Sequence, residues 1–292
     1  MPRLLIAGCG YLGQAFADLF LADGWEVEGW VKSPVKIKKP YPIIPVDISK
    51  RNQVDGCSKN FDAVVHCAST RGGDVDLYRR VYLNGASNLL NRFRDSRMLF
   101  ISSTSVYAQT NGEWVTEESA AEPKAATGTI LREAEDLALS KNGIVLRLGG
   151  IYGPGRSALL KKFLKGEAIL DPDKDRFVNA IHRDDAAMAI QLLSTRSESA
   201  GQIYNVVDNE PISQSECYRW LSAKLNCPLP ASARSIRLRE ASGRQASKRK
   251  RGESNKHVSN AKLRTLGWAP RYPNFAAGME QSVLPSFADE IA

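Results

Sequence analysis

The chain has 292 residues, with 40 Lys and Arg against 32 Asp and Glu, so its formal charge is +8. Hydrophobic residues make up 43% and charged residues 25%, which excludes wholesale disorder and a fibrous repeat. No apolar run approaches the roughly 20 residues that a membrane-spanning helix needs, so we expect no membrane partner.

The excess positive charge lies in one segment. Residues 231–271 hold twelve Lys or Arg and two Glu, a local balance of +10, so the rest of the chain sums to −2. Within this segment, the run from Lys248 to Arg251 is typical of a solvated loop, or of a loop that faces an acidic substrate. Because no aromatic side chains that could stack on bases lie near the run, we do not expect nucleic acid as a partner.

The cysteines and histidines show no metal-ligand spacing. The five cysteines include no CxxC pair, and the three histidines lie far apart in the sequence. We therefore predict no metal site, and reduced thiols in a cytoplasmic protein.

Short β-branched runs alternate with amphipathic segments along the first half, a pattern typical of βαβ units and a parallel sheet. Strands are predicted at 3–8, 26–31, 43–46, 63–67, 98–102 and 143–148, and helices at 11–23, 77–94 and 129–140. The second half predicts helices at 158–165, 184–195 and 213–225, strands at 176–181 and 203–207, and a polar, basic loop at 232–259.

A glycine-rich turn joins the first predicted strand to the first predicted helix. It reads Gly8-Cys9-Gly10-Tyr11-Leu12-Gly13, a GxGxxG motif. The first glycine permits the tight turn, the second lets the backbone approach a pyrophosphate, and the third allows the helix to pack closely on the strand. In this context the motif predicts a dinucleotide site at the start of the helix.

The end of the second strand bears on the choice of dinucleotide. An NAD site usually has a carboxylate there, to accept hydrogen bonds from the ribose. Val31 occupies that position and Lys32 follows it, while Glu28 lies in the middle of the strand. Because a cation favours a 2′-phosphate, Lys32 favours NADP(H), with NAD(H) as the alternative.

Several further runs resemble one family, the extended short-chain dehydrogenase/reductases, also called NAD-dependent epimerase/dehydratases. They are Val46-Asp47-Ile48, Val65-His66-Cys67-Ala68, Asn84, Ile101-Ser102-Ser103-Thr104-Ser105-Val106-Tyr107, Leu146 to Arg156 and Ile181 to Asp185. The resemblance implies that Asp47 meets the adenine, and that Cys67, Ala68 and Ser69 pass under the adenosine. It also implies that Ser103 is the catalytic serine, whose hydroxyl bonds a substrate oxygen.

The family's catalytic tyrosine and lysine are missing. Alignment on the Glu133-Ala134-Glu135 run puts Thr127 at the tyrosine and Leu131 at the lysine. Thr127 has no useful acidity near neutral pH, and Leu131 carries no charge. Among other hydroxyls, we rank Tyr152 first as a substitute, because it lies in the turn that would line the nicotinamide. Packing against a neighbouring loop is the alternative role for Tyr152.

The expected fold is α/β, a doubly wound parallel Rossmann sheet with a small C-terminal substrate lobe. Residues 1–155, rejoined by 180–208, would form the dinucleotide-binding domain, and 156–179 with 209–292 the lobe. We expect an NAD(P)-binding oxidoreductase or epimerase-like protein that acts on a small, sugar-like carbonyl or alcohol. The alternative is a non-catalytic dinucleotide sensor that acts through a protein partner. The family also suggests a homodimer through the helices that contain Leu77 and Thr129.

Overall fold

A computed structural model describes residues 1–34, 38–70, 72–171, 175–233 and 254–288. In these ranges, a seven-stranded sheet forms the centre of the molecule, and every neighbouring pair of its strands is parallel. In spatial order the strands are β12 (Ile203–Val206), β7 (Ile144–Leu148), β5 (Arg97–Ser103), β4 (Ala63–His66), β1 (Arg3–Ala7), β2 (Glu26–Val31) and β3 (Ile43–Pro45). The predicted doubly wound parallel sheet is confirmed.

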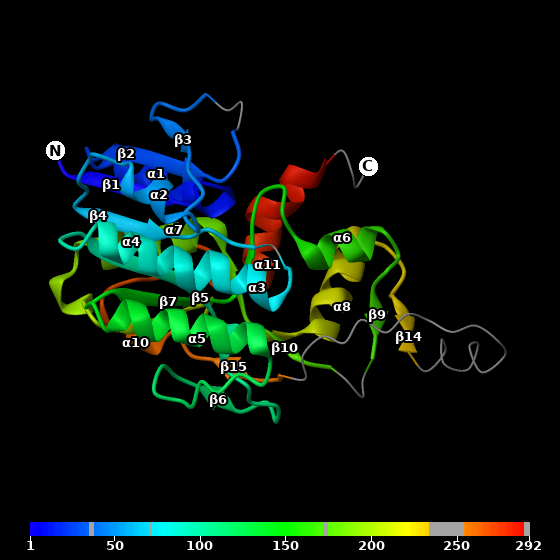
Figure 1. Cartoon of the computed structure of the whole chain (residues 1–292). Coiled ribbons are helices and arrows are strands. Elements are labelled where there is room, and N and C mark those ends of the chain that lie inside the picture. The colour runs from blue at the N-terminus through cyan, green and yellow to red at the C-terminus, as the bar shows by residue number, and fades with distance from the viewer. Residues whose placement is uncertain (35–37, 71, 172–174, 234–253, 289–292) are drawn as a thin grey trace.

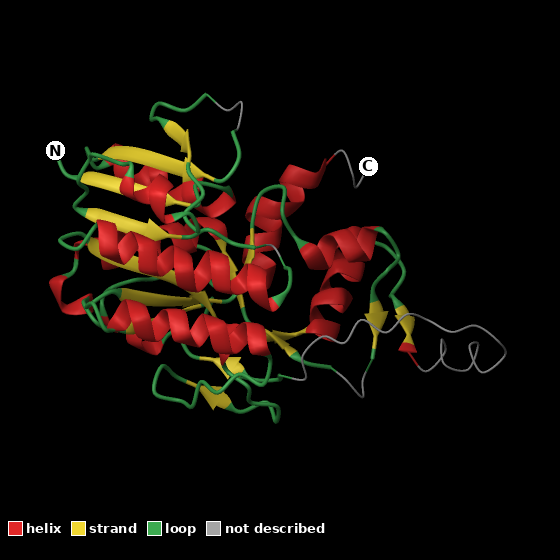
Figure 2. Cartoon of the chain, in the orientation of Figure 1, coloured by secondary structure: helices red, strands yellow, loops and turns green. Residues whose placement is uncertain are grey.

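Helices cover both faces of the sheet (Figure 1, Figure 2). One face carries α2 (Arg51–Asp55), α3 (Val75–Tyr78), α4 (Gly85–Arg92) and α5 (Ala126–Leu139), and a π-helical stretch, Arg79–Asn84, joins α3 to α4. The other face carries α1 (Tyr11–Ala22), α7 (Arg183–Thr195) and α10 (Ala261–Thr265). Within the described ranges, no helix combines the length and the hydropathy needed to cross a membrane.

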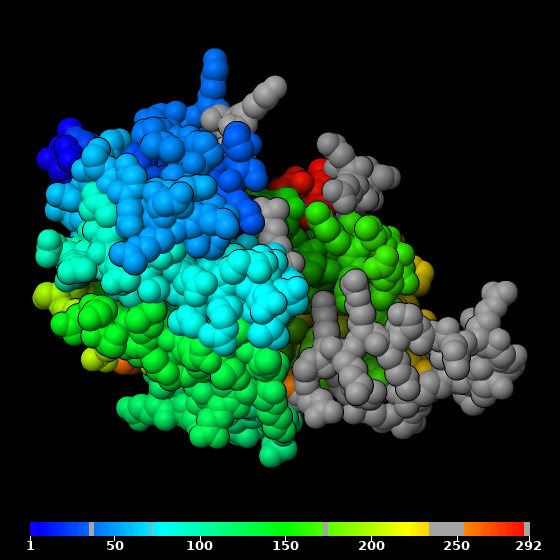
Figure 3. Space-filling view, in the orientation of Figure 1, coloured from blue at the N-terminus to red at the C-terminus, as the bar shows by residue number. Residues whose placement is uncertain are grey.

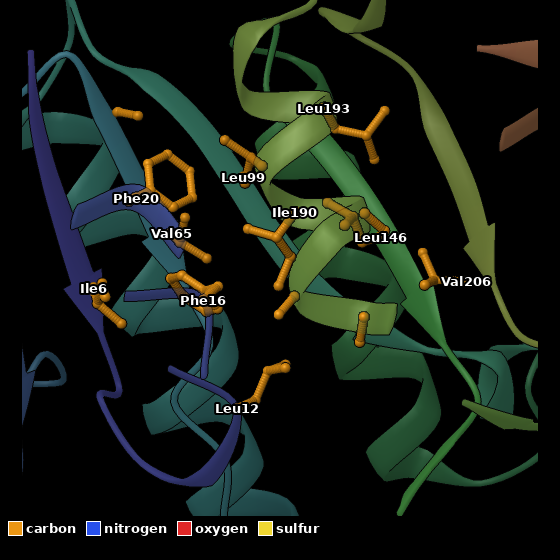
Figure 4. Close-up of a cluster of buried hydrophobic side chains, with 14 of the residues drawn as sticks. Ile6, Leu12, Phe16, Phe20, Val65, Leu99, Leu146, Ile190, Leu193 and Val206 are labelled. Atoms are coloured by element: carbon orange, nitrogen blue, oxygen red, sulfur yellow. The ribbon is translucent and has the colours of Figure 1, made fainter. Parts of the chain in front are cut away.

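The apolar runs predicted as strands are buried on both sides, as expected for a sheet between two helical layers. All four residues of β4 and all five of β7 are buried. Phe16 and Phe20 of α1 pack with Ile190 and Leu193 of α7 against the sheet (Figure 4). Their spacing of three or four residues places each pair on one helix face, which fixes how the helices seat on the strands.

A smaller lobe lies beside the sheet, on the right in Figure 1, around its own apolar cluster. Its helices are α6 (Ala158–Leu164), α8 (Gln214–Leu225) and α11 (Phe275–Gly278). Short strands in this part of the chain pair two by two: β8 (Gly150–Tyr152) with β11 (Ala180–His182), β10 (Phe177–Val178) with β13 (Ile212–Ser213), and β9 (Ile169–Leu170) with β14 (Ala231–Ser232). A capping box of Ser213 and Glu216 starts α8, so this helix begins where its sequence predicts.

The predicted loop at 232–259 is wrong at its C-terminal end. His257–Val258 forms β15, which pairs in parallel with β6 (Trp114–Val115). Leu263 and Trp268, farther along, pack into the core under α1 and α7. The chain therefore returns to the sheet after residue 254, although the division into two domains stays a prediction.

The predicted strand at 176–181 is two strands. Phe177–Val178 pairs antiparallel with β13, whereas Ala180–His182 pairs in parallel with β8. The break falls at Asn179, whose side chain donates to the Lys256 carbonyl at 2.9 Å and accepts from the Val258 amide at 2.7 Å. A polar residue that binds a distant segment therefore interrupts the apolar run.

Candidate functional site

The glycine turn leaves the start of α1 open to an anion. The amides of Gly8 and Cys9 both donate to the Trp30 carbonyl, at 3.0 and 2.8 Å, which folds the turn against β2. Gly10 is the N-cap of α1, where no side chain caps the helix and no acidic residue lies in the first turn. The free amides and the positive end of the helix dipole therefore remain available to a phosphate group.

The three glycines of the turn serve different purposes. Gly8 has a φ of +104°, and a Cβ there would lie 2.2 Å from the Ala68 amide nitrogen. A Cβ at Gly13 would lie 2.9 Å from the Ile6 side chain, so helix and strand need glycine to pack. At Gly10, by contrast, a Cβ would meet only the Gly8 carbonyl, at 3.9 Å. The fold itself does not require a glycine at 10, and the space fits a pyrophosphate that approaches the backbone.

Lys32 and Asp47 lie together at the ends of β2 and β3. The Lys32 ammonium is 3.7 Å from an Asp47 carboxylate oxygen. The other Asp47 oxygen accepts from the Ser49 amide at 3.0 Å and from its hydroxyl at 2.7 Å. Burial raises the pKa of Asp47, but the Ser49 hydrogen bonds and the Lys32 charge outweigh it, so the pKa lies below its usual value. Glu28 is engaged elsewhere, with the Trp30 indole and Lys59.

The residues after β4 complete this edge of the sheet. The Cys67 thiol donates to the Gly8 carbonyl at 3.1 Å, so the start of the Cys67-Ala68-Ser69 segment packs against the glycine turn. The strands here run in parallel, so the segments that follow β1, β2, β3 and β4 all leave the same edge. Ligands of open α/β sheets bind at this edge.

Ser103 opens onto a cleft of about 360 Å³ between the sheet and the lobe. It ends β5, and its Oγ accepts a hydrogen bond from the Ser105 amide at 3.1 Å. The hydroxyl proton of Ser103 therefore remains available to donate. The described lining is Ser103, Thr104, Ser105, Gly150, Ile151, Tyr152, Ser157, Ala158, Leu159, Arg176, Phe177, Val178, Asn179, Ala180, Gln214, Ser254, Lys256 and Phe275.

The positions of the missing catalytic pair do not contribute to this cleft. Thr127 lies in the first turn of α5 and is absent from the described lining. Leu131 is buried in the apolar cluster between α5 and the sheet. Neither Thr127 nor Leu131 is therefore among the described residues that line the cleft, and a catalytic role for Thr127 stays a prediction.

Tyr152 does line the cleft, in a mostly apolar setting. Its hydroxyl donates to the Asn274 carbonyl at 3.4 Å, and a Cβ at Gly278 would lie only 2.1 Å from the same oxygen. Burial, followed by the charges of Asp208 and Asp185, raises the pKa of Tyr152 well above its usual value. The phenol is therefore neutral at any physiological pH, and its role as a substitute acid stays a prediction.

Lys256 is a cleft residue that the sequence prediction missed. It is only 5% exposed, and its Nζ donates to the Tyr107 carbonyl at 2.9 Å. Burial, reinforced by the charge of Arg176, lowers the pKa of Lys256 to about 8. Residues 254–268 resemble the family's segment that ends the loop over the substrate. No sequence pattern, however, indicates that a lysine within a basic, polar stretch is buried.

A buried ionic network lies directly behind Ser103. Arg147 donates to Glu135 at 2.7 Å and to the Tyr107 hydroxyl at 2.9 Å, and that hydroxyl donates to Asn205 at 2.9 Å. Ser102 also donates to Glu135. The network ties β5, α5, β7 and β12 together, and so fixes the chain from Ser102 to Tyr107 that borders the cleft.

Two further points concern the basic run and the absence of metal-ligand spacing noted in the sequence. The run from Lys248 to Arg251 lies outside the described residues. Within the described ranges, no group of three or more His, Cys, Asp and Glu side chains is arranged to hold a metal ion.

The comparisons with known proteins agree with one another. A model of the NAD-dependent epimerase/dehydratase family matches residues 4–206. Protein YeeZ of Escherichia coli strain K12 is 30% identical over 221 residues, which cover 70% of this chain and 77% of YeeZ. A 3-diazoavenalumate denitrifying reductase from Streptomyces is 25% identical over 306 residues, which cover 95% of this chain and 99% of the reductase.

Among solved structures, the fold is similar to that of the UDP-glucose 4-epimerase of Thermus thermophilus in complex with NAD. The TM-score is 0.77 at 21% identity, and the match covers 100% of this chain and 99% of the epimerase. At this identity the similarity shows the fold alone.

Proposed function

The chain belongs to the NAD-dependent epimerase/dehydratase family, and we propose that it is an NAD(P)-dependent oxidoreductase or epimerase acting on a small, sugar-like carbonyl or alcohol. One observation carries this proposal: the open glycine turn and the Ser103 cleft lie at the same edge of one parallel sheet. A dinucleotide that extends from Gly10 across this edge would bring its reactive end to the cleft. The reduced thiols and the family favour the cytoplasm.

The described residues suit the cofactor. The amides at the start of α1 would hold the pyrophosphate, Lys32 and Asp47 would contact the adenosine, and Cys67, Ala68 and Ser69 would pass beneath it. The cofactor supplies hydride transfer when bound. The Ser103 Oγ already accepts a hydrogen bond from the Ser105 amide, and its hydroxyl proton is available. Ser103 therefore donates a hydrogen bond to the substrate oxygen. That hydrogen bond polarises a carbonyl and stabilises the charge that develops on its oxygen.

Removal of the Ser103 hydroxyl tests this role. We expect Ser103→Ala to lower the rate of NADPH oxidation with a panel of aldehydes and ketones by about a hundredfold. The Kd for NADPH, measured by nicotinamide fluorescence, should stay within about twofold of the original because the serine does not hold the dinucleotide. Ser105→Ala is the matched control, since it lines the same cleft and keeps the amide that contacts Ser103. Equal rates in the two variants would refute the assignment.

Lys32 should set the preference for NADP(H) over NAD(H). We expect Lys32→Ala to raise the Kd for NADPH by about five- to tenfold and to leave that for NADH nearly unchanged, because only NADPH carries the 2′-phosphate. Lys224→Ala, an exposed change on α8, serves as the control. A parallel loss of affinity for both cofactors would mean that Lys32 does not contact the 2′-phosphate.

A dinucleotide sensor is the second candidate. Thr127 and Leu131, which stand where the family has its catalytic tyrosine and lysine, favour this function. Steady turnover of NADPH with any member of the carbonyl panel would exclude it. Tight cofactor binding without turnover of any member would favour it.

A homodimer through α3, α4 and α5 is also proposed. These helices lie side by side and form part of one molecular surface (Figure 3), and Arg79, at the start of the π-helical stretch after α3, pairs with Glu133 of α5 at 3.3 Å. Sedimentation velocity of the full chain would measure the oligomeric state directly.

A further inference from the structure

The described residues that line the cleft beside Ser103 bring positive side chains to it. Its described lining contains two charged side chains, Lys256 and Arg176, and no carboxylate. The remaining lining is polar but neutral near Ser103, and apolar where Ile151, Leu159 and Phe177 form the walls. A cleft with this charge favours an anionic ligand over a neutral one.

Lys256 is held in place by hydrogen bonds on both sides. Asn179 binds the Lys256 carbonyl at 2.9 Å, and its own side-chain oxygen accepts from the Val258 amide at 2.7 Å. The preceding residue, Asn255, accepts from the Phe177 amide at 3.0 Å. Because β15 also pairs with β6, the backbone around Lys256 is fixed before any ligand binds. Such preorganisation lowers the entropic cost of binding.

Among the described residues, the Lys256 ammonium has one hydrogen-bond partner, the Tyr107 carbonyl. One of its three N–H groups donates to the Tyr107 carbonyl, and among the described residues no carboxylate forms a salt bridge with it and no second hydrogen bond is present. A buried charge without a counter-ion is costly, and proteins usually pair it. The two remaining N–H groups match the two oxygens of a carboxylate.

The charged groups around Lys256 keep it protonated near neutral pH. Burial is the largest influence and lowers its pKa, Arg176 lowers it further, and Glu113 raises it, with a result of about 8. Below about pH 8 the side chain is therefore mostly an ammonium, and above that it loses the charge. Since a bound anion would stabilise the ammonium, binding should raise this pKa.

We propose that Lys256 binds the carboxylate of the substrate, so that the substrate is a small oxo acid or hydroxy acid whose reacting oxygen meets Ser103 in the same cleft. This inference rests on the proposed function for the reacting oxygen, although the carboxylate subsite itself does not depend on hydride transfer. Arg176 adds a second positive charge, and the apolar walls accommodate the body of the molecule.

Matched acids and amides test the carboxylate subsite. Benzoate, cinnamate and pyruvate, each with its neutral amide, are titrated into the full chain by calorimetry, with and without NADP⁺. We expect at least one acid to bind more than about tenfold tighter than its amide, because only the acid meets the Lys256 charge. Lys256→Met should abolish this preference, and Lys256→Arg should retain it. Lys262→Met, at a partly exposed lysine of α10 whose ammonium donates to Gln202, should retain it as well.

The pH dependence separates a charge contact from a structural role. Carboxylate affinity should be constant below about pH 8 and fall above it, as Lys256 loses its proton. In Lys256→Arg the affinity should persist to higher pH, because arginine stays charged.

Three results would overturn the proposal: no acid preferred over its amide, a preference that survives in Lys256→Met, or phenyl phosphate binding more tightly than every acid. Failure of the proposed function has a different signature. In that case neither NADPH nor NADH binds, while the Lys256-dependent preference for acids remains.

Discussion

Gly10→Val should raise the Kd for NAD(P)H by more than about a hundredfold, while its Tm stays close to that of the unchanged protein. The reason lies in the space around this glycine. A Cβ there would meet only the Gly8 carbonyl, at 3.9 Å, so the side chain would project into the space proposed for the pyrophosphate and not into the core. Nicotinamide fluorescence measures the binding, and calorimetry the unfolding.

Gly8→Ala provides the contrast for this experiment. Its φ of +104° and the 2.2 Å approach of a Cβ to the Ala68 amide predict a loss of stability. If Gly10→Val destabilised the protein as much as Gly8→Ala, or kept full cofactor affinity, Gly10 would serve packing alone.

Arg147→Met should lower the free energy of unfolding by about 3–5 kcal/mol. The substitution leaves the fully buried Glu135 carboxylate with Arg132 as its remaining cation among the described residues, and removes a donor from the Tyr107 hydroxyl. Urea denaturation, followed by circular dichroism, measures the change. Because the network supports the chain from Ser102 to Tyr107, the folded fraction of the variant should also bind carboxylates more weakly at Lys256.

An exposed ion pair gives the scale for this loss. Arg3 and Glu26 lie 3.0 Å apart with half of each side chain exposed, so Glu26→Gln should change stability by less than about 1 kcal/mol. A loss in Arg147→Met no larger than this would show that the buried network contributes little to the fold.

The sequence predicts the sheet well because its strands are buried by helices on both faces. Runs such as 63–67 and 143–148 are mostly apolar, with His66 and Arg147 as their buried polar members, and the structure confirms the strands Ala63–His66 and Ile144–Leu148. The glycine turn also lies where the sequence predicts it, between β1 and α1, and Gly8 has a φ of +104° that favours glycine. Strands and turns that depend on residues close together in the sequence are therefore predicted from the sequence pattern alone.

The cleft is harder to predict, because distant segments build it. Asn179 splits an apolar run into two strands by binding residues 256 and 258, a contact that periodicity does not reveal. For the same reason Lys256 looks like one more cation in a basic stretch, although it is almost fully buried. The sequence identifies Ser103 and Tyr152 through family motifs, but not the charge that lies in the same cleft.

Titration of the purified chain with NADPH and with NADH, followed by nicotinamide fluorescence, tests the central claim most directly. We predict saturable binding at one site per chain, tighter for NADPH than for NADH, and lost in Gly10→Val. Absence of binding for both cofactors would mean that the glycine turn is structural, and would contradict the assignment of an oxidoreductase.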